Sequence, residues 1–189
     1  MPFVYIAVAV LAYALDRWSK NWTLELSGGK VGLFLPVKEG IFEFYYAKNE
    51  GAAWSMLSGK MWLFIAISSV VVLIGIYFLF FNRKKLPVWP SLCIAMALGG
   101  ALGNLYDRVV YGYVIDMLNV TFINYPIFNV ADSFVCVGVT LLGVWMVFFE
   151  EKQMAKMPYR WGAPKAAAEN ANTETIEENN EHDHKNCDK

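Results

Sequence analysis

The sequence is poor in the two side chains on which many enzymes rely, histidine and cysteine. Its only histidines, His182 and His184, lie near the end of the chain. The rest therefore lacks the imidazole of a Ser–His or Cys–His pair and of an HExxH zinc site. Three cysteines without a spacing pattern do not make a disulfide framework. We expect no cofactor and no metal, and chemistry that uses neither imidazole nor thiolate.

Charge is scarce as well. Charged residues are 17% of the chain and apolar residues 57%, against about 25% and 45–50% in an average soluble domain. More than half of the acidic residues lie from Glu150 onward, in a stretch without apolar periodicity. We expect an apolar domain at 1–149 and a polar, disordered cytoplasmic tail at 150–189. This composition excludes a nucleic-acid-binding protein and an ordinary soluble enzyme.

Four segments are long and apolar enough to cross a membrane. Residues 61–81 and 86–106 carry no charge, and residues 127–149 carry only Asp132. Residues 3–22 form the fourth candidate, with charges confined to its second half. Each can span the roughly 30 Å of a hydrocarbon core as a helix. The sequence predicts an all-α membrane protein, a bundle of four transmembrane helices.

The first segment has a second interpretation, a cleaved signal peptide, because Ala12-Tyr13-Ala14 has the form of a cleavage site. A signal peptide would begin with a basic region, which is missing, and charges follow the site at once. We favour an uncleaved helix. The basic turn at 82–85 and the bases after residue 150 then place both termini in the cytoplasm by the positive-inside rule.

This orientation leaves two loops outside the membrane, 23–60 and 107–126. In the first loop apolar residues alternate from Val31 to Val37 and again from Phe42 to Tyr46. A period of two indicates short strands, so we expect a small β-rich structure at the membrane surface. The mixed charges of loop 23–60 argue weakly against placing it outside.

The apolar domain contains four aspartates, and the topology brings all of them to the outer leaflet. Asp16 lies near the outer end of the first helix, Asp107 ends the third, and Asp116 lies in loop 107–126. Asp132 is expected five residues inside the fourth helix, about 8 Å deep. A charge inside a span is costly and usually marks function. Asp116 alone would more often be a solvated turn residue.

Three polar pairs have helical spacing: Asn104 with Asp107, Asn129 with Asp132, and Asp16 with Lys20. Residues three or four apart share a helix face, so each pair can hydrogen-bond or form an ion pair.

Simpler interpretations exist for part of these charges. Asp16, Arg17 and Lys20 are equally consistent with side chains that reach out to the membrane surface. Asp107 and Arg108 are equally consistent with an ion pair at a helix end.

Two function classes fit convergent aspartates without histidine. One is a hydrolase in which two carboxylates share a proton and act as base and acid. A Ser19–Lys20 dyad is a weaker enzyme option, because adjacent helical residues point in different directions. The other class is a small transporter with aspartates as proton or ion relays. The lack of visible internal repeats makes a transporter the less favoured alternative.

At this point the motifs resemble those of signal peptidase II, the bacterial lipoprotein signal peptidase family of intramembrane aspartyl peptidases. The matching segments are LDRWSK at 15–20, KNEGAAWS at 48–55, GGALGNLYDRVVYGYVIDML at 99–118 and FNVADSFVCVG at 128–138. They follow one another in register with the four spans. Together they cover nearly all of residues 1–149.

The resemblance implies a site. Its catalytic pair would be Asp116 and Asp132. The residues implied to contact substrate or support this pair are Asn49, Gly51, Asn104, Arg108, Asn129, Asp16, Lys20 and Asp107.

The resemblance also implies a substrate, a prolipoprotein whose cysteine already carries diacylglycerol. Cleavage would occur just before that cysteine, at the outer side of the bacterial cytoplasmic (inner) membrane. The partners would be this substrate and membrane lipid, and we expect the enzyme to be a monomer.

Overall fold

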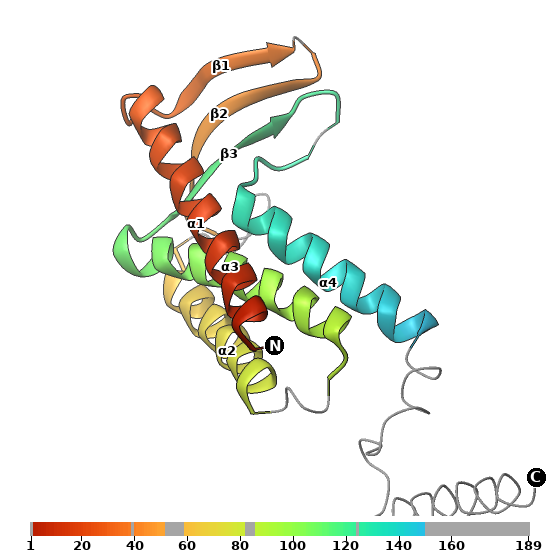
Figure 1. Cartoon of the computed structure of the whole chain (residues 1–189). Helices are drawn as coiled ribbons and strands as arrows, with labels where there is room; N and C mark the ends of the chain where they lie inside the picture. Colours follow the sequence, from red (N-terminus) through yellow and green to blue (C-terminus); the bar gives the residue numbers. More distant parts are fainter. Residues whose placement is uncertain (1, 39, 52–58, 82–85, 124, 150–189) are drawn as a thin grey trace, which may run out of the picture. The chain divides into compact units, whose positions relative to one another are not determined.

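The structure is a computed structural model, which describes residues 2–38, 40–51, 59–81, 86–123 and 125–149. The element order is α1 (Pro2–Leu26), β1 (Gly32–Lys38), β2 (Phe42–Asn49), α2 (Met61–Phe80), α3 (Val88–Val110), β3 (Val114–Val120) and α4 (Val130–Phe148) (Figure 1). The expected disordered tail, the basic turn 82–85 and residues 52–55 of the KNEGAAWS segment lie outside the described residues.

Three helices of the described part, α2, α3 and α4, are long and apolar enough to cross a membrane. They differ in burial, because 56% of the apolar window of α3 is buried against 11% in α2 and in α4. Helix α3 therefore lies at the centre of the packing, while α2 and α4 present apolar side chains outward. Such large exposed apolar surfaces fit a hydrocarbon environment and not water.

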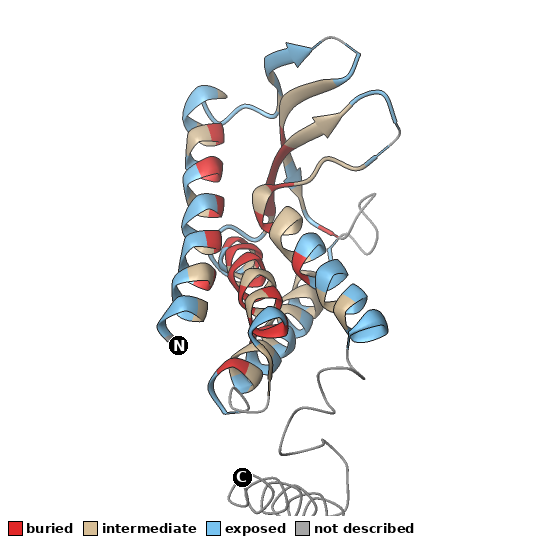
Figure 2. Cartoon of the chain, turned by 45° about the vertical axis from the view of Figure 1, so that its right-hand side comes forward, coloured by how far each residue is buried: buried red, intermediate tan, exposed pale blue. Residues whose placement is uncertain are grey.

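Small residues on α3 allow its neighbours to approach closely. A Cβ atom at Gly99 would meet the backbone of Ala9 on α1, and one at Gly100 would meet the backbone of Ala131 on α4. Close packing through small residues is typical of membrane helices. Figure 2 shows buried residues concentrated on α3 and along one side of α1.

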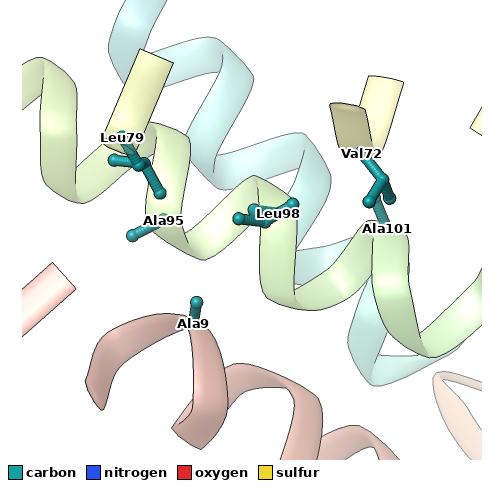
Figure 3. Close-up of a cluster of buried hydrophobic side chains, with 6 residues drawn as sticks. All are labelled: Ala9, Val72, Leu79, Ala95, Leu98 and Ala101. Atoms are coloured by element: carbon teal, nitrogen blue, oxygen red, sulfur yellow. The ribbon is translucent and has the colours of Figure 1, made fainter. Parts of the chain in front are cut away.

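The apolar core is built on the same helix. Its buried side chains come from α1, α2 and α3, and Figure 3 shows them side by side: Ala9, Val72, Leu79, Ala95, Leu98 and Ala101.

The sheet has three antiparallel strands in the order β1-β2-β3. The expectation that loop 23–60 forms strands is confirmed by β1 and β2. Within the expected outer loop 107–126, for which the sequence indicated no strand, residues 114–120 form β3, in which Asp116 pairs with Ala47. Residues 114–117 are all buried, so this strand lacks the alternation that reveals a half-exposed one.

The fourth helix begins later than the expected residue 127. Phe128 is still extended, because it forms an antiparallel bridge with Leu118. Asn129 then accepts a hydrogen bond from the Asp132 N–H on its side-chain oxygen at 2.8 Å, which is N-cap geometry. Asp132 is therefore in the first turn of α4 and not five residues inside it. Its carboxylate lies at the helix start, where the positive end of the helix dipole favours negative charge.

Candidate active site

Polar side chains from four elements gather at one place, where the C-terminal halves of α1 and α3 meet β3 and the start of α4. The residues with buried polar side chains at this place are Asp16, Lys20, Asn104, Asp107, Asp116 and Asn129. Elsewhere the contacts between α1, α2 and α3 are mainly apolar. Buried polar groups are costly unless each is paired, so the partners of each group matter.

Asp116 is 2% exposed and accepts two hydrogen bonds from side-chain amides. Asn49 Nδ2 donates to Oδ2 at 2.9 Å, and Asn129 Nδ2 donates to Oδ1 at 2.7 Å. Burial, and after it the nearby charge of Asp132, raise the pKa of Asp116 to about 7 against the opposing effect of the two amide hydrogen bonds. Near neutral pH, Asp116 is therefore present in both its protonated and its ionised form.

Asp132 is held by a matching set of donors. Asn104 Nδ2 donates to its Oδ1 at 2.7 Å, and the backbone N–H of Asn129 donates to its Oδ2 at 3.3 Å. Since the Asn129 side chain also donates to Asp116, one asparagine contacts both carboxylates. The two aspartates thus form a pair connected by a single residue.

Lys20 determines which way the Asn104 amide points. Its Nζ donates to Asn104 Oδ1 at 2.9 Å, and Asn129 Nδ2 donates to the same oxygen at 3.1 Å. With the oxygen engaged by these donors, the Asn104 Nδ2 group is directed toward Asp132. A neutral amide therefore connects the lysine to one member of the pair.

Behind the pair lies a cluster of four charges, three of them fully buried and Arg17 largely so, which we call the ionic cluster: Asp16, Arg17, Lys20 and Asp107. Lys20 Nζ lies 2.9 Å from Asp16 Oδ2 and 2.7 Å from Asp107 Oδ2. Arg17 Nη2 lies 2.9 Å from Asp16 Oδ2 and 2.7 Å from Asp107 Oδ1. The predicted pair of Asp16 with Lys20 is present.

Two simpler interpretations of these charges are wrong. Lys20 does not reach out to the membrane surface, because its side chain is fully buried. Asp107 forms its ion pairs with Arg17 and Lys20 rather than with the adjacent Arg108.

Arg108 and Asn49 complete the group of expected residues. Arg108 Nη1 donates to the Asn104 backbone oxygen at 3.2 Å, and its guanidinium lies 5.6 Å from the centre of the Phe64 ring. Asn49 Oδ1 accepts from the Gly51 N–H at 3.0 Å, which directs its Nδ2 toward Asp116. Gly51 thus belongs to the site through Asn49.

The Ser19–Lys20 option loses its basis in this geometry. Ser19 Oγ donates to the Asp16 backbone oxygen at 2.9 Å, and Lys20 is paired with two carboxylates. Ser19 and Lys20 are therefore each bound to other groups and form no hydrogen bond with one another among the described residues.

The comparison with protein families decides between the remaining classes. Residues 8–148 match the family model described as signal peptidase (SPase) II. The chain belongs to the signal peptidase II family. Membership makes it a membrane protease, and nothing in the comparisons favours a transporter.

Curated relatives cover almost the whole described part. The chain is 42% identical over 149 residues to a lipoprotein signal peptidase of Enterococcus faecalis, covering 78% of this chain and 90% of the relative. It is 36% identical over 150 residues to one of Clostridioides difficile, covering 79% and 98%. A solved bacterial membrane enzyme, determined by the in meso method, has a TM-score of 0.67 at 30% identity and covers 76% of this chain and 87% of its own.

Sequence reasoning missed Arg17 as part of the site. Its partners Asp107 and Gly103 lie far along the chain, so no local pattern could link them to it. The sequence offered one indication, that Arg17 directly follows Asp16. A side chain that reaches out to the membrane surface explained this position equally well.

A cavity of about 570 Å³ lies elsewhere. Its walls are apolar side chains of α1, α2 and α3, among them Leu98 and Leu102, and it includes none of the expected site residues. An apolar space of this kind has no groups for proton transfer, so the polar pair and not the cavity is the candidate active site of this family member.

Proposed function

We propose that this member of the signal peptidase II family is an aspartyl endopeptidase that removes signal peptides from prolipoproteins. Asp116 and Asp132 are the catalytic residues. The observation that carries this proposal is the pairing of two carboxylates through Asn129, with every further contact made by a neutral amide or a backbone N–H.

The pair works with one proton between its two members. Like charges held close together do not both ionise readily, so one carboxyl stays protonated while the other is ionised. The ionised carboxylate removes a proton from water, whose oxygen attacks the scissile carbonyl carbon. The protonated carboxyl donates its proton to the carbonyl oxygen. When the tetrahedral intermediate collapses, the C–N bond breaks and a proton passes to the leaving amine.

The asparagines keep both carboxylates aligned for these transfers. Asn49, Asn129 and Asn104 donate hydrogen bonds but carry no charge. A cation in their place would favour two ionised carboxylates and remove the shared proton. Arg108 lies near both aspartates and has a guanidinium edge available for a substrate carbonyl.

The substrate is a prolipoprotein whose cysteine already carries diacylglycerol, and cleavage occurs before that cysteine. The supporting observation is the place of the pair, at the ends of α3 and α4, which are long enough to span the membrane. A substrate held in the bilayer by its lipid reaches this level without leaving the membrane. Asp116 is itself a residue of β3, so the three-stranded sheet adjoins the catalytic pair.

The topology that fits this substrate has α1 as a fourth span and both termini in the cytoplasm. Helix α1 has 25 residues, enough to cross the hydrocarbon core. The site then faces the extracytoplasmic side of the bacterial cytoplasmic membrane. We expect the enzyme to act as a monomer, because the pair and the ionic cluster can form without a residue from a second chain.

Cleavage by the purified, full-length chain in lipid nanodiscs tests the proposed function. The substrate is a prolipoprotein supplied with and without the diacylglyceryl group, and products are measured by mass spectrometry. We expect cleavage before the modified cysteine and a large preference for the lipidated form. Equal cleavage of both forms contradicts the substrate assignment. No cleavage together with ion flux through liposomes that depends on Asp132 supports the transporter instead.

A further inference from the structure

The residues that precede the two catalytic aspartates are both held by the ionic cluster. Asp16 Oδ1 accepts a hydrogen bond from the backbone N–H of Ala131, next to Asp132, at 3.0 Å. Asp107 Oδ2 accepts one from the backbone N–H of Ile115, next to Asp116, at 3.2 Å. Asp16 therefore anchors the start of α4, which carries Asp132. Asp107 anchors β3, which carries Asp116.

The two anchors are connected to each other by cations. Arg17 Nη2 lies 2.9 Å from Asp16 and 2.7 Å from Asp107, and it donates to the Gly103 backbone oxygen at 3.3 Å. Lys20 makes a second bridge between the same carboxylates. Two positive and two negative charges cancel, so the bridges hold the anchors together without leaving a net charge behind the pair.

Arg17 is the bridge that does not touch the catalytic pair. Lys20 also contacts Asn104, which binds Asp132, so its removal would disturb the pair directly. Among the described residues, Arg17 forms hydrogen bonds and ion pairs with Asp16, Asp107 and Gly103, and with neither catalytic aspartate nor the asparagines. A change at Arg17 thus isolates the effect of the connection between the anchors.

The surroundings of Arg17 hold its guanidinium in this one place. Its guanidinium carbon lies 4.7 Å from the centre of the Tyr106 ring and 6.0 Å from that of Tyr13. Gly103 gives the room that this needs, since a Cβ there would meet the Asp16 carboxylate. The Nε atom of Arg17 is buried without a partner among the described residues. An unsatisfied buried donor lowers stability, so stability alone does not explain the position of Arg17.

We propose that Arg17 is a positioning residue that sets the separation of Asp116 and Asp132 by holding their anchors, Asp16 and Asp107, together. The proposal rests on the proposed function, in which these two aspartates share one proton. It adds a residue outside the pair that controls how strongly its two members interact.

The interaction between the two carboxylates provides a readout that a merely structural role would not change. Repulsion between like charges falls as their separation grows. A closely coupled pair loses its protons in two steps with well-separated apparent pKa values, and a wider pair brings these values together. The other charged groups around the pair are Lys20 on α1, Asp107 and Arg108 on α3, and Lys48 on β2, whose ammonium lies over the Tyr113 ring.

The experiment measures kcat as a function of pH for four forms of the full-length enzyme: wild type, Arg17→Gln, Asp16→Asn/Arg17→Gln and Lys48→Gln. For Arg17→Gln we expect kcat to fall by about 10²-fold, the cost of moving a catalytic group by about 1 Å. KM should be unchanged. Its two apparent pKa values move closer together, and both rise because a positive charge is lost.

The double variant separates geometry from charge. It removes one charge of each sign, so the ionic cluster stays neutral, and asparagine at position 16 can still accept the Ala131 hydrogen bond. We expect the same convergence of the two pKa values without the common rise. Lys48→Gln removes an exposed positive charge near the site and should keep the wild-type kcat and pKa separation. Arg17→Lys, which retains the charge, should recover part of the activity.

Two results overturn the proposal. One is a wild-type kcat for Arg17→Gln. The other is a loss of activity that matches the loss of folded protein, with the two pKa values as far apart as in the wild type. The separation can also be read from ¹³C NMR titration of the aspartate carboxyls, which needs no substrate. A failure of the substrate assay would therefore contradict the proposed function and leave the test of Arg17 intact.

Discussion

The interface between α1 and α3 has two levels with opposite chemistry. At the first level Ala9 and Ala12 pack against Gly99 with no polar side chain between them. About 10 Å further along α1, at 1.5 Å per residue, Asp16 and its neighbours form the ionic cluster with α3. The first level holds the helices together by close packing, whereas the second holds backbone groups beside the catalytic pair.

The comparison suggests a division between stability and positioning. Replacing buried ion pairs by apolar side chains often leaves stability unchanged or raises it. The ionic cluster is therefore poorly explained as a device for stability alone. Its carboxylates accept from N–H groups of β3 and α4, which apolar side chains could not do. Changes at the two levels should accordingly have different signatures.

The largest expected effect is at the polar level. Lys20→Met removes the fully buried cation of the ionic cluster and leaves two carboxylates facing Arg17 alone. Breaking a buried ion pair from one side costs about 3–5 kcal/mol, so we expect a marked fall in Tm together with loss of cleavage. The matched control is Lys30→Met at an exposed site, which should change neither. Wild-type stability for Lys20→Met would contradict the account of this level.

The next effect concerns activity without a large loss of stability. Asn129→Ala removes the side chain that donates to the Asp116 carboxylate and accepts from the Asp132 backbone N–H. We expect kcat to fall by about 10²–10³-fold, the cost of losing one well-placed donor, with the protein still folded by circular dichroism. Asn119→Ala removes an asparagine that binds Glu43 across the sheet and should retain activity. Equal activities of the two variants would show that Asn129 is not part of the machinery.

The apolar level should give the reverse signature. Gly99→Ala places a methyl group against the Ala9 backbone, and overpacking of this kind costs about 1–3 kcal/mol. We expect a lower Tm and, for the molecules that remain folded, a pH profile like that of the wild type. Gly143→Ala is the matched control, because a Cβ there meets nothing within 4 Å. A changed pH profile for Gly99→Ala would show that the two levels are not separable.

The smallest effect is a shift in one titration. The charge of Asp132 is the second cause, after burial, that raises the pKa of Asp116 to about 7. Asp132→Asn removes this charge, so the pKa of Asp116 should fall below the wild-type value while burial keeps it above 3.8. ¹³C NMR of the aspartate carboxyls measures the change. An unchanged or higher pKa would mean that the two carboxylates do not interact.

In the wild type, burial of Asp116 and its interaction with Asp132 together set the pH range of activity. The mechanism needs one proton on the pair, so activity should fall as pH rises through about 7, where the remaining proton is lost.

The sequence allowed the helical segments and two of the three polar pairs to be predicted, because both are local patterns. Apolar runs indicated the helices, and spacings of three and four indicated the pairs Asn129–Asp132 and Asp16–Lys20, which are both present. The third expected pair, Asn104 with Asp107, does not form among the described residues, where Asn104 donates to Asp132 and Asp107 accepts from Ile115. Strand β3 could not be predicted, since VIDMLNV has no alternation and its pairing partners lie about 70 residues earlier. The start of α4 was misplaced because the extended conformation of Phe128 depends on its bridge with Leu118 and is not apparent in the apolar run around it.

The ionic cluster shows the same limit in the site. The pairing of Asp16 with Lys20 follows from their spacing on one helix. The contacts of Arg17 and Lys20 with Asp107 depend instead on how α1 packs against α3, and composition alone made exposure of these charges equally reasonable. Whether these charges are buried depends on contacts between residues far apart in the sequence. No local pattern in a single sequence reveals such contacts.

The central claim is that Asp116 and Asp132 are the catalytic pair. The most direct measurement is single-turnover cleavage of the diacylglyceryl prolipoprotein by Asp116→Asn and Asp132→Asn, each shown to be folded. Glu43→Gln, in which the carboxylate bound by Asn119 is replaced, is the matched control. We predict a loss of about 10²–10⁴-fold or more for each aspartate variant and full activity for the control. Wild-type cleavage by either aspartate variant would contradict the account.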